Sequence, residues 1–292
     1  MLARRHRFAL QLQRWISRVN SPWFIGFFYF LLQVWAGYSC PDLKQFRKRV
    51  RDLLNQAGDR PLIICANHLT MIDSMIINWL MFGYVDYLRH WRLMPWNMPE
   101  IRNFAANIPL RIMCYLGKSL YVERGGTLAQ RRLTVEKFRQ LLEWRELICI
   151  FPEGTRSRTG RIRGSPPTYS VGELCQLLPE AQVLCVYVRG YGQQTWGHVP
   201  KRGERFAIEI DLMVPATPHS GRRGAKDIAI QIMEKLGTME DHFWTQFPTY
   251  SETNTVPLDP VAATAIPPEP AAGPAIPSAP AAATATATNP PS

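Results

Sequence analysis

Short and almost uninterrupted apolar runs recur along the middle of the chain, and they constrain the fold more than any other feature. The clearest are "PLIICA" at 61–66, "LICIF" at 147–151 and "VLCVYV" at 183–188. Strands that are apolar along their whole length are buried on both faces, as in parallel sheets covered by helices. The expected strands are 61–66, 84–88, 118–123, 147–151, 183–188 and 206–212. Amphipathic patterns separate several of them and predict helices at 70–82, 127–144 and 225–237.

These patterns predict an α/β fold with a mostly parallel sheet covered by helices on both faces. Three regions are expected along the chain. Residues 1–58 form a membrane-associated helical region, residues 59–246 the α/β domain, and residues 247–292 a disordered tail. The tail is almost wholly Pro, Ala and Thr, so it has little large apolar surface to bury.

The charge of the chain is strongly positive and uneven. The whole sequence has 34 Lys and Arg against 23 Asp and Glu, a net charge of +11. From Phe247 onward there is no basic residue, and removing the three acids found there leaves 34 basic against 20 acidic residues for 1–246. Such a surface predicts an anionic partner. There is no zinc-finger spacing, basic zipper or aromatic RNA-binding signature, so we expect an anionic membrane or a phosphorylated ligand and no nucleic acid.

The first 38 residues have the pattern of a membrane-surface segment. Residues 1–19 place large apolar side chains at helical spacing among five arginines, as in a basic amphipathic helix. Residues 22–38 follow without a formal charge and with aromatic residues suited to a membrane interface. Positive charge on both flanks favours a shallow, monotopic insertion over a single pass, although a buried core helix is the alternative.

Six cysteines lie mostly within apolar runs and form no C-x-x-C pair, which is typical of buried thiols in a reducing compartment. They predict no metal site. Together with the basic N-terminus they predict a protein at the cytoplasmic face of the inner membrane.

Unusual polar residues follow three of the expected strands. Asn67-His68 follows the first, with Asp73 five residues after the histidine. Arg124 ends "SLYVER", and "FPEGTRSRTGRIRG" follows the strand at 147–151. Ligands of such sheets gather at the carboxyl ends of the strands, so these residues are expected to share one site. Each has a plainer interpretation, since Thr70-x-x-Asp73 can cap a helix and the arginines can be solvated.

The combination of "NHLTMID" at 67–73 with "FPEGTRS" at 151–157, and a Val-x-Arg strand end between them, resembles the glycerolipid acyltransferase family, of the 1-acyl-sn-glycerol-3-phosphate acyltransferase type. The resemblance covers about residues 20–215. It implies transfer of a fatty acyl group from acyl-CoA or acyl carrier protein to the free hydroxyl of a lysophospholipid, giving phosphatidic acid from the simplest acceptor, with no further cofactor.

The same resemblance assigns roles to residues of the three strand ends. His68 is the expected general base, held in the right tautomer by Asp73. Arg124 belongs to the motif for the acceptor phosphate, and the third motif supplies the further acceptor-binding residues Glu153, Gly154, Thr155 and Arg156. Beyond the resemblance, we expect the phosphates of the acyl donor to meet Arg158, Arg161 and Arg163.

Two departures put the identity of the lipid acceptor and acyl donor in doubt. The strand "VLCVYVRGYG" has no proline where the family usually has one near the strand end, and Pro166, Pro167 and Tyr169 replace a basic, small-residue stretch. Another lyso-lipid, such as a lyso-ornithine lipid, is therefore an alternative acceptor. A membrane-bound lipid-binding protein without turnover and a hydrolase that uses water are the functional alternatives.

Overall fold

The computed structural model describes residues 2–104, 107–123, 125–162 and 167–247. Its sheet contains four strands in the order β2-β1-β3-β4. They are β1 (Leu62–Ala66), β2 (Ile148–Ile150), β3 (Gln182–Gly190) and β4 (Phe206–Met213). Strand β1 pairs in parallel with β2 and β3, whereas β4 pairs antiparallel to β3. The sheet is therefore mostly parallel, as the apolar strands predicted.

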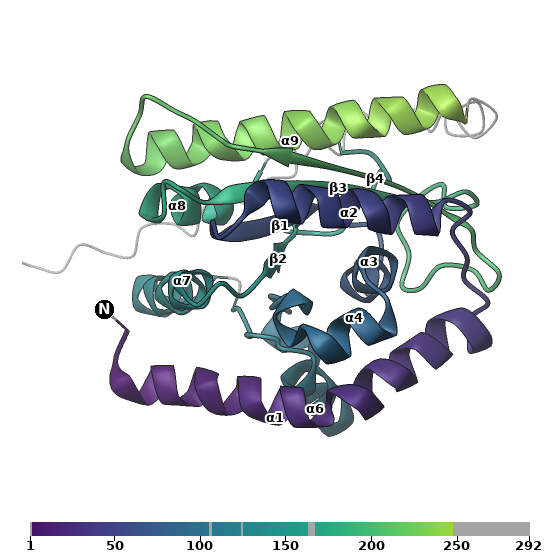
Figure 1. Cartoon of the computed structure of the whole chain (residues 1–292). Helices are drawn as coiled ribbons and strands as arrows, with labels where there is room; N and C mark the ends of the chain where they lie inside the picture. The colour runs from purple at the N-terminus through teal and green to yellow at the C-terminus, as the bar shows by residue number, and fades with distance from the viewer. Residues whose placement is uncertain (1, 105–106, 124, 163–166, 248–292) are drawn as a thin grey trace, which may run out of the picture. The chain divides into compact units, whose positions relative to one another are not determined.

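Helices occupy much of the remaining described chain. In order they are α1 (Arg4–Tyr29), the π-helical turn η1 (Phe30–Trp35), α2 (Leu43–Ala57), α3 (Asp73–Met81), α4 (Tyr84–Arg89), the 3₁₀ turn η2 (Trp91–Leu93), α5 (Ile101–Phe104), α6 (Ile108–Leu116), α7 (Leu128–Glu143), α8 (Ser170–Leu177) and α9 (Gly221–Gln246). Figure 1 shows their arrangement around the strands.

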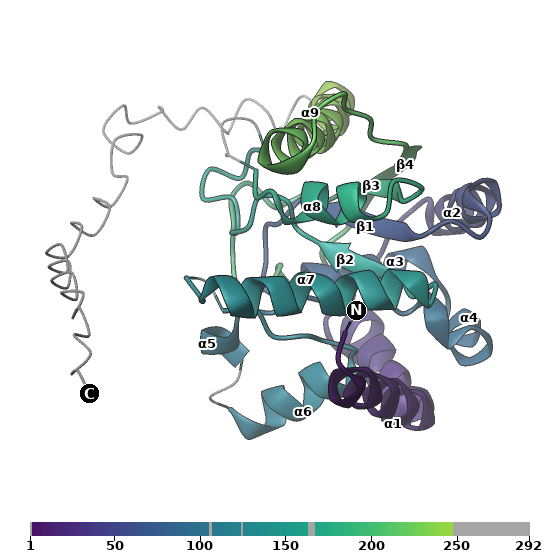
Figure 2. The same ribbon diagram turned by 90° about the vertical axis from the view of Figure 1, so that its left-hand side faces the viewer.

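Both faces of the sheet are covered because successive side chains of a strand point to opposite sides. On one side Ile63 and Cys65 pack in a cluster with residues of α7, α8 and α9. On the other side Leu62 and Ile64 pack with residues of α2, α3 and α4. In Figure 2, α2 and α4 lie to the right of the strands. The prediction of helices on both faces is confirmed.

The expected strand at 84–88 is wrong, since α4 occupies these residues. The Asp86 carboxylate accepts the Gly83 N–H at 2.8 Å, which satisfies one of the free donors at the start of a helix. Tyr87 is buried, and its hydroxyl donates to the main-chain oxygen of Asn78 at 2.7 Å. A short helix start therefore outweighed the β propensity of "YVDYL".

The expected strand at 118–123 is only partly formed. Ser119 and Val122 make isolated parallel bridges to Asn97 and Glu100, and Trp96 bridges in turn to Ile148 in β2. The chain thus extends the sheet beyond β2 by two irregular segments. The extended segment starts at Ser119 and not at Lys118, because Lys118 lies in the turn after α6 with a φ of 54°, in the left-handed region.

The predicted helices are present with altered bounds. Helix α7 begins after Thr127, whose hydroxyl accepts the Gln130 N–H while the Gln130 amide oxygen accepts the Thr127 N–H. Helix α3 begins at Asp73, three residues later than expected, because Thr70 and Asp73 bond to each other in the preceding turn. Helix α9 contains the expected 225–237 and is longer at both ends.

The two N-terminal segments form one helix, since α1 continues through Pro22 to Tyr29 and the π-helical turn follows directly. The inward face of α1 is largely polar. The Gln13 amide donates to the main-chain oxygens of Tyr115 and Ser119, both at 3.1 Å, and the Ser17 hydroxyl donates to Leu116 at 2.5 Å. Specific hydrogen bonds therefore hold α1 against α6 and the segment after it.

A buried charge cluster adds a second attachment for α1. Glu146 lies between Arg14 of α1, at 2.9 Å, and the fully buried Lys118, at 2.5 Å. The Trp96 indole N–H also donates to Glu146 at 3.0 Å. Burial lowers the pKa of Lys118 to about 8, against the opposing effect of Glu146. The carboxylate of Glu146 thus connects α1, the end of α7 and the edge of the sheet.

Two sequence-based expectations concern the ends of the chain. The expected disordered tail, apart from Phe247, lies outside the described residues. Within the described parts of the chain, no helix is both long enough and apolar enough to cross a bilayer.

Candidate active site

Strand β1 ends just before Asn67. There the Asn67 side chain, in place of its main chain, forms the hydrogen bonds to the neighbouring strand β3. Its amide nitrogen donates to the Val188 oxygen at 2.9 Å, and its amide oxygen accepts the Val188 N–H at 2.8 Å. Both bonds are buried, where an unpaired amide would be costly. Asn67 therefore fixes where the chain turns out of the sheet, and so where His68 begins the loop.

His68 and Asp73 form the pair that the sequence predicted. The imidazole Nδ1 lies 2.9 Å from Asp73 Oδ2, with the aspartate side chain only 5% exposed and the histidine 20%. A carboxylate accepts hydrogen bonds, so Nδ1 carries the hydrogen and Nε2 keeps its lone pair. The geometry leaves Nε2 available to accept a proton, as a general base must.

Asp73 is itself held in place by the loop before it. Its carboxylate accepts the main-chain N–H groups of Leu69, at 2.5 Å, and Thr70, at 2.7 Å, and also the Thr70 hydroxyl. Asp73 is the first residue of α3, where the helix dipole favours a negative charge. These bonds order the turn before α3, but the N-cap of α3 is Ile72 and no side chain caps it, so the predicted Thr70 helix cap is not formed.

The "FPEGTRS" loop after β2 forms a second side of the site. The Phe151 ring stacks on the His68 imidazole, with ring centres 4.2 Å apart and planes inclined by 18°. The Ser157 N–H donates to the His68 main-chain oxygen at 2.8 Å. Strands β1 and β2 are neighbours in the sheet, so their following loops meet at its carboxyl edge, as expected for a parallel sheet.

Glu153 lies behind His68 and is buried. Its Oε1 accepts the His68 N–H at 2.8 Å, and its Oε2 has no hydrogen-bond partner among the described residues. Burial raises the pKa of Glu153 to about 8, the His68 N–H opposes this shift, and the charges of Glu240 and Asp73 add to it. A carboxyl group in this position supports the main chain of His68.

We expect Glu153→Gln to change the pH dependence of folding stability. The folded-state pKa of about 8 exceeds the unfolded value of 4.5, so the folded protein binds more protons between these two values. Stability from Glu153 is fully present below pH 4.5 and is lost as the pH rises through about 8. As the pH rises through this window, the unfolding free energy of the wild-type protein should fall relative to that of Glu153→Gln by up to about 1.4 kcal/mol per pH unit.

Urea unfolding of both proteins at a series of pH values measures this difference. A difference that stays constant from pH 5 to 8 would contradict the raised pKa.

Gly154 is required by the close approach of Thr168. Its φ is +68°, and an added Cβ would lie 2.3 Å from Thr168 Cγ2. Thr168 is held by its N–H and hydroxyl, which both donate to the Pro152 oxygen. A glycine here lets the loop after β2 close on itself.

The arginines expected to bind the substrates differ in their surroundings. Arg156 donates to the Gly197 oxygen at 3.1 Å and lies over the Trp196 ring, while Thr155 and Arg158 are exposed. The guanidinium of Arg161 lies 3.8 Å from the centre of the Trp244 ring on α9. Arg124 and Arg163 lie outside the described residues. The roles of these arginines stay predictions.

Sequence reasoning missed a buried ion pair that holds the same loop. Arg189, at the end of β3, donates to the oxygens of Gly160, Gln193 and Gln194 at 2.6 to 2.9 Å and lies 3.7 Å from Glu240. Glu240 in turn accepts the Ile162 N–H at 2.9 Å. An arginine within the apolar run "VLCVYVRG" and a glutamate on the buried stripe of α9 were the available signals.

The comparison with family models gives a match that covers this part of the chain. A family model described as "Acyltransferase" matches residues 45–189, which run from α2 through β1 and β2 to Arg189 in β3. No curated protein matches the chain at a significant level. The matched range contains His68, Asp73 and the whole "FPEGTRS" loop. Residues 45–189 are therefore similar to the acyltransferase family over just under half of the chain.

Proposed function

We propose that this protein is an acyltransferase that moves a fatty acyl group from acyl-CoA or acyl carrier protein to the free hydroxyl of a lysophospholipid. The observation that carries the proposal is the His68–Asp73 pair, whose geometry leaves Nε2 free beside the loop after β2. The favoured acceptor is 1-acyl-glycerol 3-phosphate, which gives phosphatidic acid. An arginine-rich loop next to the base supports an acceptor with a phosphate.

The proposed reaction is a direct transfer. His68 Nε2 takes the proton of the acceptor hydroxyl as its oxygen attacks the thioester carbonyl. The tetrahedral intermediate then expels the thiolate, which takes the proton from the imidazolium, so one C–O bond forms and one C–S bond breaks. The sequence has no G-x-S-x-G nucleophile elbow, which favours this route over an acyl-enzyme. Asp73 stabilises the imidazolium, and Glu153 positions the main chain of His68.

A panel of acceptors tests the substrate class. The purified protein is incubated with labelled acyl-CoA, or acyl carrier protein, and with lysophosphatidic acid, other lysophospholipids or lyso-ornithine lipid. We expect a diacyl product from a phosphate-bearing acceptor, identified by mass spectrometry. A diacyl product from lyso-ornithine lipid alone would keep the reaction and reject the phosphate acceptor. Lipid binding without any product from either donor would favour the binding-protein alternative.

The outward face of α1 supports a membrane location for this reaction. The large apolar side chains that α1 and the following η1 expose recur every three or four positions, which places them in one stripe: Phe8, Leu12, Trp15, Val19, Trp23, Phe27, Phe30 and Val34. The inward face carries the buried polar residues Gln13, Ser17 and Ser21. This polarity is inverted relative to a surface helix of a soluble protein.

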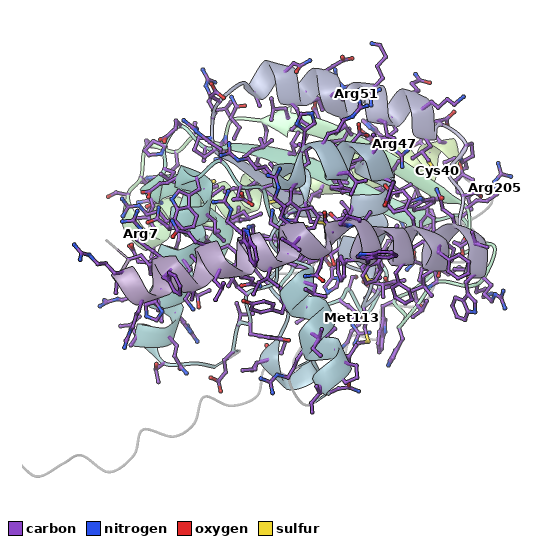
Figure 3. The ribbon with its side chains drawn as sticks, turned by 60° about the horizontal axis from the view of Figure 1, so that its bottom comes forward. Arg7, Cys40, Arg47, Arg51, Met113 and Arg205 are labelled. Atoms are coloured by element: carbon purple, nitrogen blue, oxygen red, sulfur yellow. The ribbon has the colours of Figure 1, made fainter. Side chains whose placement is uncertain are left out.

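Basic residues and helix α6 lie next to the exposed apolar stripe of α1. Figure 3 shows α1 crossing the face, with Arg7 near its N-terminal end and Met113 on the neighbouring α6. Ile108 and Ile112 of α6 are 68% and 55% exposed. An apolar stripe beside arginines fits an anionic bilayer surface, and we propose its cytoplasmic side, where acyl-CoA and acyl carrier protein are found.

We expect the double variant Trp15→Asp/Trp23→Asp to lose membrane binding. The two side chains are 64% and 83% exposed, so their removal should leave the fold unchanged. Loss of the two tryptophans removes roughly 3–6 kcal/mol of favourable transfer free energy into lipid. This corresponds to a loss in vesicle affinity of at least about 100-fold. Co-sedimentation with anionic vesicles measures it.

The matched control is Leu177→Asp/Val214→Asp, which places the same two charges at exposed apolar positions on other elements. Equal binding by the two double variants would reject α1 as the membrane contact.

A further inference from the structure

A cavity lies between α1, α6, α7 and the extended segment before residue 123, away from His68. Its volume is about 240 Å³. The side chains that the argument uses are Gln13, Tyr115, Ser119, Tyr121, Thr134 and Lys137. β2 and the irregular segment around Trp96 separate this part of the sheet from β1. The cavity is therefore distinct from the candidate active site.

Lys137 brings a positive charge into this cavity without a matching negative one. The residue is half-buried, and burial lowers the pKa of its ammonium group. Among the described residues no carboxylate forms an ion pair with it, whereas the neighbouring Arg139 on the same helix pairs with Glu136 and Glu143. Reduced hydration and the charges of Lys137 and Arg5 lower the pKa of His6, so basic groups gather here. A desolvated cation without a counter-ion favours an anionic ligand.

The other polar groups divide into those already bonded and those able to donate. The Gln13 amide donates both hydrogens to main-chain oxygens, and the Thr134 hydroxyl donates to the Gln130 oxygen at 3.0 Å. Burial, together with Cys114, raises the pKa of Tyr121 to about 12, so its phenol keeps its hydrogen. Tyr115 adds a further hydroxyl, whereas the Ser119 hydroxyl, like that of Tyr121, interacts with the Cys114 thiol. One ammonium group and several hydroxyls are donors suited to the oxygens of a phosphate.

We propose that this cavity binds a phosphate-bearing ligand, supplied either by the head group of an anionic lipid or by a soluble phosphate ester. The position favours the head group, because two of the three helices that border the cavity, α1 and α6, expose apolar side chains on their outer faces. This part of the inference rests on the membrane contact proposed above. The volume is below the roughly 300 Å³ of sites for whole drug-sized ligands, so the acyl chains would remain outside.

The test compares Lys137→Gln with Arg132→Gln in the full chain. Arg132 is an exposed residue of α7, so its variant removes the same charge from the same helix without touching the cavity. In the first arm, binding is measured to phosphatidylcholine vesicles with and without phosphatidic acid. In the second arm, binding of sn-glycerol 3-phosphate is measured by calorimetry. Thermal unfolding shows that both variants fold.

We expect Lys137→Gln to lower the affinity for the phosphate ligand by about 10- to 100-fold relative to Arg132→Gln. This is the loss expected when one hydrogen bond to a charged group is removed. A selective loss on phosphatidic acid vesicles identifies the lipid source, and a selective loss with glycerol 3-phosphate identifies the soluble source. Equal behaviour of the two variants in both arms would overturn the proposal.

A second measurement keeps the test independent of folding defects and of the proposed function. The pKa of Lys137 is followed by NMR in the wild-type protein during titration with each phosphate compound. A bound phosphate must raise this pKa, because an adjacent negative charge favours the ammonium form. An unchanged pKa at saturating ligand would reject the site. Neither readout requires acyl transfer, so a failure of the proposed reaction would leave both results interpretable.

Discussion

The variant His68→Ala is expected to lose about 10²- to 10⁴-fold in kcat/KM for acyl transfer, the usual contribution of a general base. The physical reason is the geometry of the imidazole, which bonds Asp73 through Nδ1 and stacks on Phe151, leaving Nε2 for the acceptor hydroxyl. The His68 side chain is partly exposed and its structural hydrogen bonds use its main chain. Its removal should therefore change the rate far more than the melting temperature.

The chain offers a matched control for this experiment. His219, just before α9, has its Nδ1 2.6 Å from Oδ2 of Asp227 in α9, so the two form a second histidine–aspartate pair, which is partly exposed. His219→Ala removes an equivalent pair and should retain full activity. Steady-state rates of the two variants at several acceptor concentrations measure the difference. A His68→Ala enzyme as active as His219→Ala would exclude His68 as the base.

The variant Glu146→Ala is expected to lose about 3–5 kcal/mol in unfolding free energy, the cost of breaking a buried ion pair by removing one partner. Lys118 is fully buried, and Glu146 is the carboxylate that pairs with it among the described residues. Without that carboxylate the lysine must stay charged in a buried site, with only the Trp91 and Met94 main-chain oxygens as acceptors within the described chain, or lose its proton. Arg14 and the Trp96 indole lose a partner at the same time.

Denaturant unfolding of Glu146→Ala and of Glu143→Ala measures this loss. Glu143 is an exposed residue three positions earlier that pairs with Arg139, so its removal should cost no more than about 1 kcal/mol. Because Arg14 belongs to α1, Glu146→Ala should also make α1 more accessible to hydrogen exchange. Equal stability of the two variants would show that the buried cluster contributes little.

The strands that the sequence predicted correctly are those set by a local pattern of apolar residues. The apolar runs at 61–66, 147–151 and 183–188 became β1, β2 and β3, because a strand that is buried on both faces is apolar along its whole length. The run at 206–212 became β4, which is only partly buried. The segment "YVDYL" failed because its residues suit both a strand and a short helix, and the Asp86–Gly83 bond decided between them.

The candidate site was predictable where its residues are close in sequence. His68 and Asp73 are five positions apart, so their pairing could be expected before the loop was seen. The pairs Arg189–Glu240 and Lys118–Glu146 join residues on separate elements, and only the folded chain brings them together. Glu153 was expected at the acceptor, and its burial behind His68 depends on packing that no spacing in the sequence reveals.

The proposed transfer of an acyl group to a lipid hydroxyl is tested most directly by running the reaction in water enriched in ¹⁸O. Transfer to the acceptor gives a diacyl lipid without ¹⁸O, because the new ester oxygen comes from the lyso-lipid. Hydrolysis gives free fatty acid that carries ¹⁸O from the solvent. We predict unlabelled diacyl lipid as the main product of the wild-type protein, and its loss in His68→Ala. Labelled free fatty acid as the main product, with no diacyl lipid, would contradict the proposed transfer and identify water as the acceptor.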